Sequence, residues 1–364
     1  MAIMQYGKAI YRNLKFKQHL RNRTALSVET AEQILLDYLP KSAPNFRQKN
    51  KIDPKYDVMI IVPVYNVENY LEQCIESILN QKTNYTYQAV FVNDGSTDSS
   101  GAILDRCIPA PHVVIHKKNG GVSAARNDAL RRITGRYLMF MDSDDLLEPH
   151  ALERLVSTAD EMNADIVEGS HTFFGADREP ELFSHGAELC QIHHLELYGF
   201  PWGKVISCKL LEDFCFPEGY LFEDTVMATL LHPASSMNIA IPDTVYRYRD
   251  NHSGITHSSK AKKTSVDTFW ITKYCLEERI RRGDQLRHEH YVRYLIAVRR
   301  NWLRTNSLPE QIQEAIFSLT CDLFERNLPF QYVGNENRMF LLTQAIQARS
   351  YKAYHFLMER WDIL

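Results

Sequence analysis

The chain has 364 residues, 45% of them hydrophobic, and a net charge of -3. This length suits one large domain with an appendage rather than a single small domain. A near-neutral charge argues against nucleic acid as a partner. The seven cysteines are scattered and form no Cys-x-x-Cys pair, which argues against a disulfide framework or a zinc knuckle and favours a reducing cytosol.

The N-terminal arm, residues 1–23, is basic and carries apolar residues at helical spacing. Two interpretations stay open: a helix packed on the protein surface, or an amphipathic helix on the inner face of the cell membrane. No run approaches the roughly 20 apolar residues that span a bilayer, and no signal-peptide core is present. We therefore expect a cytoplasmic protein, with peripheral membrane contact through this arm as the alternative. The cations are Lys8, Arg12, Lys15, Lys17, Arg21 and Arg23, and the apolar residues are Ile3, Tyr6, Ile10 and Leu14.

Residues 41–57 are rich in Pro, Asn, Lys and Asp and are interpreted as a linker. Beyond it, short apolar runs alternate with segments of helical periodicity, which predicts an α/β fold with a parallel sheet covered by helices on both faces. The expected strands are 58–64, 89–92, 113–115 and 137–141. The expected helices are 71–79, 98–107, 122–133 with Gly135 as its stop, and one that starts at Pro149.

From Thr264 onward the periodicity is helical to the last residue. We therefore predict three regions: residues 1–55 as a basic helical arm and linker, 56–260 as the catalytic domain, and 261–364 as a helical C-terminal region.

Polar residues follow the predicted strands at the points where ligands bind in doubly wound sheets. The first strand is followed by Tyr65 and Asn66, the second by Asn93 to Asp98, and the fourth by Asp142 to Asp145. Three carboxylates within the last four residues repel one another unless a cation neutralises them. Because Mg²⁺ and Mn²⁺ prefer oxygen ligands, this cluster predicts a metal site. A helix N-cap is the alternative, and it fits Asp145.

Two further stretches are weaker signals. The Asp94-Gly95-Ser96 sequence is also ordinary turn chemistry. Paired glycines at Gly120 and Gly121 precede a predicted helix that carries Arg126, and arginine pairs bidentately with phosphate. The spacing matches neither the dinucleotide fingerprint nor the P-loop.

Together these pieces resemble the inverting family 2 glycosyltransferases with the GT-A fold, a Rossmann-like sheet flanked by helices. The resemblance covers roughly residues 56–257 and leaves out both ends of the chain. Where that family usually has an aspartate before Asp94, this chain has Asn93. The matching motifs are PVYN at 63–66, NDGSTD at 93–98, NGGVSAARN at 119–127, MDSDD at 141–145 and the pair Glu223 and Asp224.

The resemblance implies a role for each matched residue. Asp224 would be the general base, with Glu223 beside it. Asp144 would hold Mn²⁺ or Mg²⁺, and Asp142 would contact the metal or the ribose. Trp202 would shape the donor or acceptor pocket, Arg247 is an alternative to Arg249, and His252 is an additional candidate ligand that equally fits an exposed loop histidine. The nucleotide sugar would contact Pro63, Tyr65, Asn66, Asp94, Gly121, Arg126, Asp142, Ser143, Lys204, Arg249 and Ser253.

The implied reaction moves a sugar from a UDP-sugar donor to the hydroxyl of a glycan or glycoconjugate acceptor. The product would be a surface polysaccharide, a teichoic acid or a glycoprotein glycan. A nucleotidyltransferase and an inactive sugar-nucleotide-binding scaffold remain as alternatives. The former would need a basic glycine-rich loop after the first strand, and the latter would be expected to lack the metal or base carboxylate. The sugar, the acceptor and the oligomeric state, a homo-oligomer included, stay open.

Overall fold

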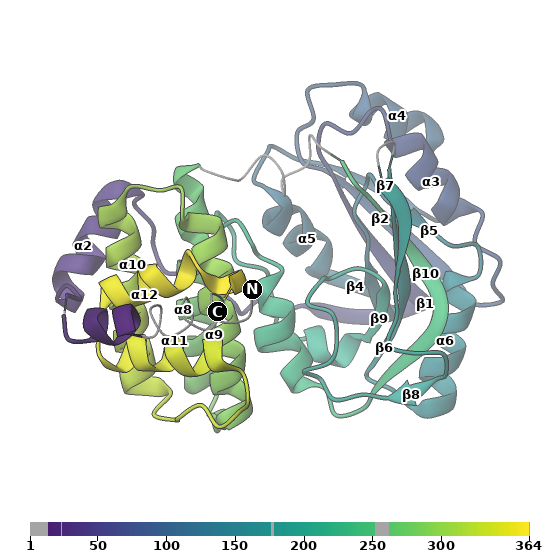
Figure 1. Cartoon of the computed structure of the whole chain (residues 1–364). Helices are drawn as coiled ribbons and strands as arrows, with labels where there is room; N and C mark the ends of the chain where they lie inside the picture. The colour runs from purple at the N-terminus through teal and green to yellow at the C-terminus, as the bar shows by residue number, and fades with distance from the viewer. Residues whose placement is uncertain (1–13, 23, 176–177, 252–261, 364) are drawn as a thin grey trace. The chain divides into compact units, whose positions relative to one another are not determined.

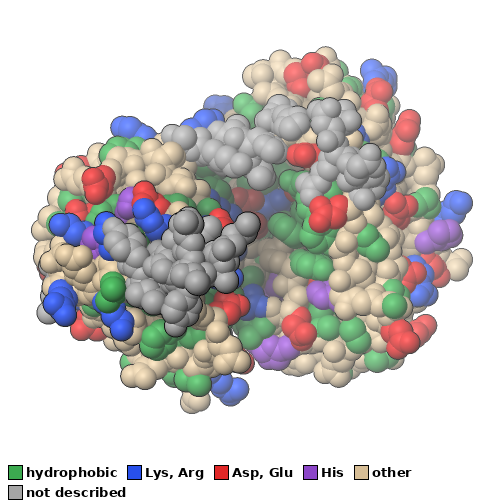
Figure 2. Space-filling view, viewed as in Figure 1, with side chains coloured by type: hydrophobic (Ala, Val, Ile, Leu, Met, Phe, Trp, Pro, Cys, Tyr) green, Lys and Arg blue, Asp and Glu red, His purple; other side chains and the backbone are tan. Residues whose placement is uncertain are grey.

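The computed structural model describes residues 14–22, 24–175, 178–251 and 262–363. The chain divides into two compact units (Figure 1): one is Pro44–Ser258, and the other joins Met1–Ala43 to Ser259–Leu364. No helix among the described residues is long and apolar enough to cross a bilayer. On the face drawn in Figure 2, acidic and basic side chains are interspersed, in line with the near-neutral net charge.

The helical unit is discontinuous in sequence. Apolar faces of its helices meet in one core that includes Leu295, Phe317, Leu342 and Leu357, and helix α2 packs on α10. Residues 1–55 therefore do not form a region of their own, because 14–43 pack with the C-terminal helices. The helices are α2 (Val28–Tyr38), α8 (Asp267–Arg281), α9 (His288–Thr305), α10 (Glu310–Asn327), α11 (Asn337–Gln347) and α12 (Tyr351–Met358).

The described part of the N-terminal arm is tied into this unit. Residues 14–20 are helical, Phe16 is 2% exposed, and its ring belongs to the helical core. Leu14, predicted to lie on the apolar face, is 62% exposed. The His19 carbonyl accepts a hydrogen bond from the Ser350 hydroxyl at 2.9 Å. For residues 14–22 these contacts favour packing on the protein, whereas Ile3, Tyr6 and Ile10 lie outside the described residues.

Phe16→Ala is expected to destabilise the helical unit by about 3–5 kcal/mol, since it removes a buried ring and leaves a cavity. Leu14→Ala, two residues away, is the matched control and should change the free energy of unfolding by less than about 0.5 kcal/mol. Urea unfolding followed by tryptophan fluorescence measures both variants. Equal, small changes would show that the arm does not contribute to the helical core.

The second unit is built on one ten-stranded sheet. Strands β1, β2, β3 and β4 are parallel to one another, and β10 is parallel to β6. The short strand β9 lies antiparallel between β4 and β6 and joins the two parallel groups. The order is β3-β2-β1-β4-β9-β6-β10-β5, with β7 on β6 and β8 on β10. The bounds are β1 Lys51–Val64, β2 Tyr87–Asn93, β3 Val113–His116, β4 Arg132–Phe140, β5 Leu146–Leu147, β6 Ile166–Gly175, β7 Arg178–Phe183, β8 Cys190–Gln191, β9 Lys204–Ser207 and β10 Asn238–Arg249.

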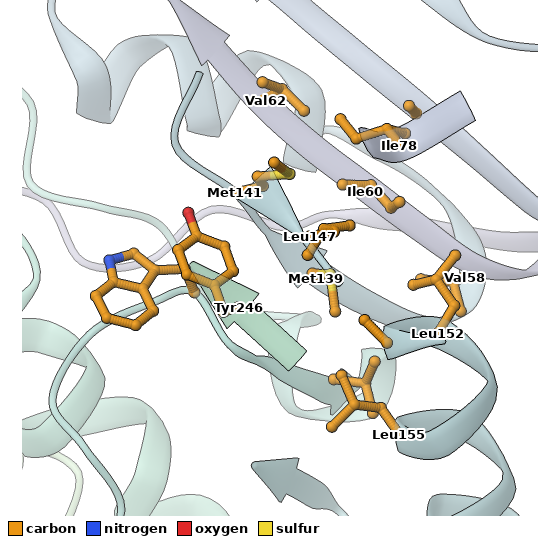
Figure 3. Close-up of a cluster of buried hydrophobic side chains, with 14 of the residues drawn as sticks. Val58, Ile60, Val62, Ile78, Met139, Met141, Leu147, Leu152, Leu155 and Tyr246 are labelled. Atoms are coloured by element: carbon orange, nitrogen blue, oxygen red, sulfur yellow. The ribbon is translucent and has the colours of Figure 1, made fainter. Parts of the chain in front are cut away.

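Helices cover both faces of this sheet, as the alternation predicted. Helices α3 (Leu71–Leu79), α4 (Ser100–Cys107) and α6 (Ala151–Met162) lie on one face, and α5 (Val122–Leu130) lies on the other (Figure 1). Side chains alternate along a strand, so Val58, Ile60 and Val62 of β1 all point toward the first group of helices (Figure 3). The sheet unit is α/β with helices on both faces of a mostly parallel sheet, the architecture that the sequence predicts.

Two local predictions are wrong. Residues 51–57, expected to be linker, form the first half of β1, where Lys51 pairs with Arg132. Pro54 argued against a strand, because proline has no N–H to donate to a ladder. In the structure Pro54 lies between Ile52 and Tyr56, where the register shifts and the ladder is interrupted. Gly135 does not stop a helix either: α5 ends at Leu130, and Gly135 lies inside β4, where a Cβ atom would collide with the Met59 backbone nitrogen.

Candidate active site

The polar loops meet at one edge of the sheet. Because β1, β2 and β4 are parallel, the residues after Val64, Asn93 and Phe140 share the edge formed by their carboxyl ends. Strand β10 ends at the same edge, and the backbone N–H of its last residue, Arg249, donates to the Asp145 carboxylate at 2.7 Å. The sequence predicted three of these strand ends as the site, and the structure adds β10 as the fourth.

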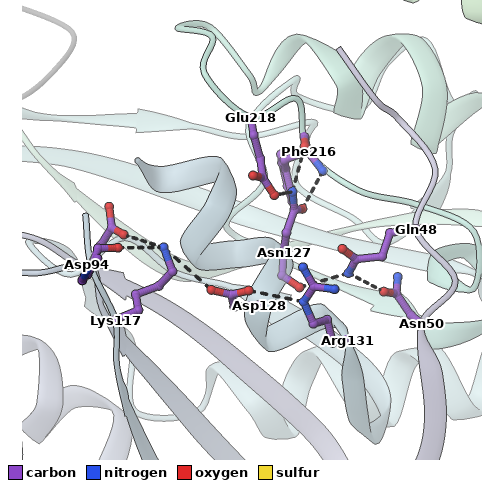
Figure 4. A network of polar contacts seen from close by, with 10 residues as sticks. Gln48, Asn50, Asp94, Lys117, Asn127, Asp128, Arg131, Phe216 and Glu218 are labelled. Atoms are coloured by element: carbon purple, nitrogen blue, oxygen red, sulfur yellow. Dashed lines mark hydrogen bonds and ion pairs between the residues drawn. The ribbon is translucent and has the colours of Figure 1, made fainter. Parts of the chain in front are cut away.

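Asp94 organises the turn that precedes α5. Its buried carboxylate accepts hydrogen bonds from the backbone N–H groups of Gly120 and Gly121 at 2.9 and 2.7 Å. It also accepts one from Lys117 Nζ at 3.0 Å (Figure 4). Gly121 has φ +88°, a conformation that favours glycine, and caps α5. Asp94 therefore fixes the glycine turn, while its contact with a nucleotide stays a prediction.

The loop after β1 presents one exposed ring at this edge. Pro63 is buried within β1, whereas Tyr65 is 48% exposed. Asn66 adopts φ +51°, and its side-chain oxygen accepts a hydrogen bond from Thr97 N–H at 2.8 Å. This bond ties the loop after β1 to the loop after β2, as expected for two walls of one pocket.

The four residues Asp142 to Asp145 have different surroundings. Asp145 is fully buried and accepts hydrogen bonds from the Tyr246 hydroxyl and the Arg249 backbone N–H, both at 2.7 Å. Burial raises its pKa well above the ordinary range, and the neighbouring charges of Asp144 and Asp142 add to the rise. No helix begins at this residue, so the N-cap interpretation is wrong for Asp145. Ser143 is buried between its neighbours.

Asp144, which the sequence predicts to hold a metal, is bonded to the end of β10 and the residues after it. One oxygen accepts a hydrogen bond from Asn251 at 2.9 Å, and its backbone carbonyl accepts one from Arg249 Nε at 2.7 Å. Burial raises the pKa of Asp144, Asn251 opposes the rise, and the negative charge of Asp142 adds to it. A nearby divalent cation would relieve this repulsion.

Arg126 connects the acidic loop, residues 142–145, to Glu223, the residue before the predicted base Asp224. It is 3% exposed, and its guanidinium donates to Asp142 at 2.9 Å and to Glu223 at 2.8 Å. The guanidinium also lies over the Phe216 ring, 5.1 Å from its centroid. Burial disfavours the charge of Arg126, but Asp142 and Glu223 outweigh burial and raise its pKa. Arg126 thus holds the two acidic segments together.

The carboxylates of Glu223 and Asp224 differ in their partners, because Glu223 accepts a hydrogen bond from Arg126 and Asp224 does not. Burial raises the pKa of Glu223, Arg126 opposes the rise, and the charge of Asp224 adds to it. Asp224 is half-buried, and within the part of the chain that the structure describes its carboxylate has no hydrogen bond or ion pair. Asp224 is therefore the better placed of the two to receive a proton.

The segment at the end of β10 favours one arginine over the other. Arg249 donates to the Asp144 carbonyl and, at 2.8 Å, to Gln73. Arg247 points to Glu148, 3.9 Å away. Both guanidiniums lie over the Phe174 ring. His252 and Ser253 lie outside the described residues.

Lys204 lies in a buried cluster. Its side chain is fully buried, forms an ion pair with the equally buried Glu168, and donates to the Tyr198 carbonyl at 2.6 Å. Burial raises the pKa of Glu168, but the charge of Lys204, together with hydrogen bonds from His185 and the Tyr198 N–H, outweighs burial and lowers it. Trp202 stacks between Phe200 and Tyr246, with ring centroids 4.6 Å from each. The surroundings of Lys204 fit a structural ion pair, and its contact with the donor stays a prediction.

Lys204→Met is expected to cost about 3–5 kcal/mol of stability, because it leaves the buried Glu168 Oε2 without the charge that faces it, while His185 contacts only the other oxygen. Arg106→Met is the control: Arg106 is 64% exposed and pairs with Glu72, which is 57% exposed, so the loss of this surface pair should cost less than about 1 kcal/mol. Thermal unfolding measures both variants. A stable Lys204→Met protein that no longer binds UDP would instead assign Lys204 to the donor pocket.

Sequence reasoning missed Tyr246 and Phe216. The Tyr246 hydroxyl donates to the Asp145 carboxylate and accepts a hydrogen bond from Asp142 N–H at 3.1 Å. The alternation Tyr-Arg-Tyr-Arg at 246–249 could have indicated a strand with tyrosines on one face and arginines on the other. Phe216 has no local signal, since only the fold brings it to Arg126.

The acidic loop offers two carboxylates to a metal. Among the described residues, no group of three or more His, Cys, Asp or Glu side chains is placed to hold a metal ion. A hard divalent cation is often held by one or two carboxylates together with substrate phosphates, so Asp142 and Asp144 fit this donor set.

Comparison with known proteins identifies the domain. Residues 59–202 match the model of glycosyl transferase family 2. These residues are a family 2 glycosyltransferase domain. The match spans three of the loops described above, those after β1, β2 and β4. It ends before Asp224, so the assignment of the base rests on the residues themselves.

Relatives in Streptococcus and Bacillus resemble part of the chain. The glycosyltransferase GlyA of Streptococcus pneumoniae is 31% identical over 60% of this chain and 32% of that protein. The minor teichoic acid biosynthesis protein GgaB of Bacillus subtilis is 40% identical over 60% of this chain and 26% of that protein. The alignments thus span about a third or less of these two relatives.

One solved structure shares the fold across most of the chain. TarS of S. aureus, residues 1–349 in complex with UDP-GlcNAc, aligns with a TM-score of 0.65 and 19% identity, covering 84% of this chain and 91% of that one. The likeness confirms the fold class.

Proposed function

We propose that the chain is a metal-dependent, inverting glycosyltransferase that moves a sugar from a UDP-sugar donor to an acceptor hydroxyl. The observation that carries this proposal is the Arg126 bridge, which joins Asp142 of the acidic loop to Glu223 beside the open carboxylate of Asp224. In this proposal, groups for the departing nucleotide and a group for the incoming hydroxyl would be held together by this bridge. The family 2 match supports the same reaction class.

In this proposal Asp142 and Asp144 would hold Mn²⁺ or Mg²⁺. Bound there, the ion would neutralise the charge that develops on the departing diphosphate. Tyr65 and Asp94 would line the nucleotide pocket, and Arg249 would support the loop of Asp144 from the end of β10.

Asp224 would accept the proton of the acceptor hydroxyl as its oxygen attacks the anomeric carbon. The new glycosidic bond forms as the bond between the sugar and UDP breaks on the opposite face, so the anomeric configuration inverts. This single displacement needs no covalent intermediate. Glu223, held by Arg126 at 2.8 Å, would position the segment that carries the base.

The chemical class of the product is proposed from the relatives. GgaB is named for minor teichoic acid biosynthesis, and another relative is a poly(ribitol-phosphate) beta-glucosyltransferase of Bacillus spizizenii, 37% identical over 31% of this chain. We infer that the acceptor is a bacterial surface glycan or teichoic acid. Membrane contact through the N-terminal arm, residues 1–23, homo-oligomerisation and a cytoplasmic location stay predictions.

The experiment is a donor screen that measures UDP release. UDP-N-acetylglucosamine, UDP-glucose and other UDP sugars are incubated with the full chain, with Mn²⁺ or with EDTA. We expect Mn²⁺-dependent UDP release from at least one donor. Pyrophosphate formed from UTP and a sugar phosphate would instead identify a nucleotidyltransferase. UDP binding without turnover of any donor would identify an inactive homologue.

A further inference from the structure

We infer that Asn127 is a positioning residue for the segment that leads to Asp224, an inference that rests on the proposed function. Asn127 lies on α5 and is 1% exposed. Its side-chain oxygen accepts a hydrogen bond from Phe216 N–H at 2.8 Å, and its side-chain nitrogen donates to the Phe216 carbonyl at 2.9 Å (Figure 4). An asparagine amide matches a peptide group in this way because it offers one acceptor and two donors.

The second amide hydrogen of Asn127 makes a third hydrogen bond, in addition to the two with the Phe216 backbone. It donates to the Glu218 carboxylate at 3.0 Å, two residues beyond Phe216. Figure 4 shows Asn127 pointing from α5 into this turn. Because Phe216 is fully buried, its N–H and C=O groups need these partners, and removing the amide would leave both without them. Three hydrogen bonds from one side chain therefore fix residues 216–218.

This segment carries the Arg126 bridge. The Phe216 ring supports the Arg126 guanidinium, and that guanidinium holds Glu223 and Asp142. A shift of residues 216–218 would move the Phe216 ring that supports the Arg126 guanidinium. It would also move Asp224, which follows six residues after Glu218. Asn127 and Arg126 are consecutive on α5, so one turn of this helix positions both the Arg126 guanidinium and the amide that holds Phe216.

The same helix also begins at the nucleotide side of the site. Its N-cap, Gly121, is held by Asp94, and its second turn holds Phe216. Helix α5 would therefore fix the distance between the donor pocket and the base. Asn127 should affect transfer more than donor binding, because its bonds lie at the base end of the helix.

Three variants test this role in the full chain. Asn127→Ala removes all three hydrogen bonds. Asn127→Asp keeps the acceptor for Phe216 N–H but loses the donor and repels Glu218. The double variant Asn127→Asp with Glu218→Gln restores a hydrogen bond of reversed polarity between positions 127 and 218. Asp165→Ala is the matched control, because Asp165 is also buried and accepts hydrogen bonds from backbone N–H groups, those of Ser236 and Met237. It precedes the first residue of β6 and so lies away from the carboxyl ends of the parallel strands.

The readouts are kcat and KM for Mn²⁺-dependent UDP release from whichever UDP sugar the wild-type chain uses, with UDP affinity by calorimetry and thermal stability measured separately. For Asn127→Ala we expect kcat to fall about 10- to 100-fold, as for a catalytic group misplaced by about 1 Å, with UDP affinity unchanged within about threefold. Asn127→Asp should lose a similar factor, and the double variant should recover part of it. Asp165→Ala should lose stability but keep kcat.

Two results would overturn the inference. If Asn127→Ala keeps kcat within about threefold of the wild type, or loses no more activity than Asp165→Ala at equal stability, Asn127 only contributes to folding. If the donor affinity falls along with kcat, Asn127 belongs to the nucleotide pocket instead. A folded wild-type chain that releases no UDP from any donor would sink the proposed function itself, an outcome distinct from both.

Discussion

Asp224→Asn is expected to lower the rate of sugar transfer by about 10²–10⁴-fold, the usual contribution of a positioned general base. The substitution keeps the size and hydrogen-bonding reach of the side chain but removes its ability to accept the proton. The loss should appear in kcat rather than in KM for the donor. UDP affinity in Mn²⁺, measured by calorimetry, should stay near the wild-type value because, among the described residues, no hydrogen bond or ion pair joins the Asp224 side chain to the acidic loop or the glycine turn.

Glu223→Gln is the matched control for this prediction. Glu223 is already paired with Arg126 at 2.8 Å, so it is less available to receive a proton. A glutamine can still accept that hydrogen bond, and the variant should lose less activity than Asp224→Asn. A general base contributes at least about 10²-fold to the rate. If Asp224→Asn kept more than about a tenth of kcat, the loss would be too small for a base, and Glu223 would be the first residue to test instead.

Asp144→Asn should lower the Mn²⁺-dependent affinity for UDP by at least about 10- to 100-fold, the loss that even a residue one step removed from a metal causes. The asparagine can still accept the hydrogen bond from Asn251, so the loop should keep its shape while losing the charge that a cation needs. Calorimetry of UDP with Mn²⁺ and with EDTA measures the effect without any turnover. The thermal stability of the variant without ligand should stay close to that of the wild type.

Asp145→Asn separates the metal ligand from its neighbour. Asp145 accepts hydrogen bonds from two donors, Tyr246 and Arg249, and an asparagine cannot accept from both in the same geometry with its nitrogen facing one of them. Asp145→Asn should therefore lower the thermal stability, whereas Asp144→Asn should lower the UDP affinity. Unchanged Mn²⁺-dependent UDP affinity in a folded Asp144→Asn protein would rule out Asp144 as the metal ligand.

The sequence predicted the first half of the sheet because its strands are buried on both faces. Residues 58–64 form an unbroken apolar run, and Leu71 to Leu79 show a clean helical period, so each element has a local signal. The second half of the sheet has none of comparable strength. Strand β9 has four residues, from Lys204 to Ser207, and begins with a charged side chain that only its partner Glu168 makes tolerable in the core.

The site divides in the same way. Motifs within a few residues of one another, such as Asp142 and Asp144, were visible in the sequence. The pairing of Arg126 with Glu223 joins residues 97 positions apart, and no spacing rule predicts it. Likewise, Asp94 was expected to face a nucleotide, and only the structure shows that it also holds the glycine turn before α5.

The discontinuous helical unit has a consequence for how the chain is made. The N–H of Leu26 bonds the Ser318 hydroxyl, 292 residues away, and the N–H of Thr24 bonds the Arg349 carbonyl. At about 5–20 residues per second, translation from residue 43 to the end of α10 takes roughly 15–60 s. The sheet unit is complete well before that moment and can fold on the ribosome, whereas Phe16 and Leu35 must wait for their partners. A nascent chain stalled before α10 should therefore hold a folded sheet unit and an N-terminal segment that is open to chaperones and proteases.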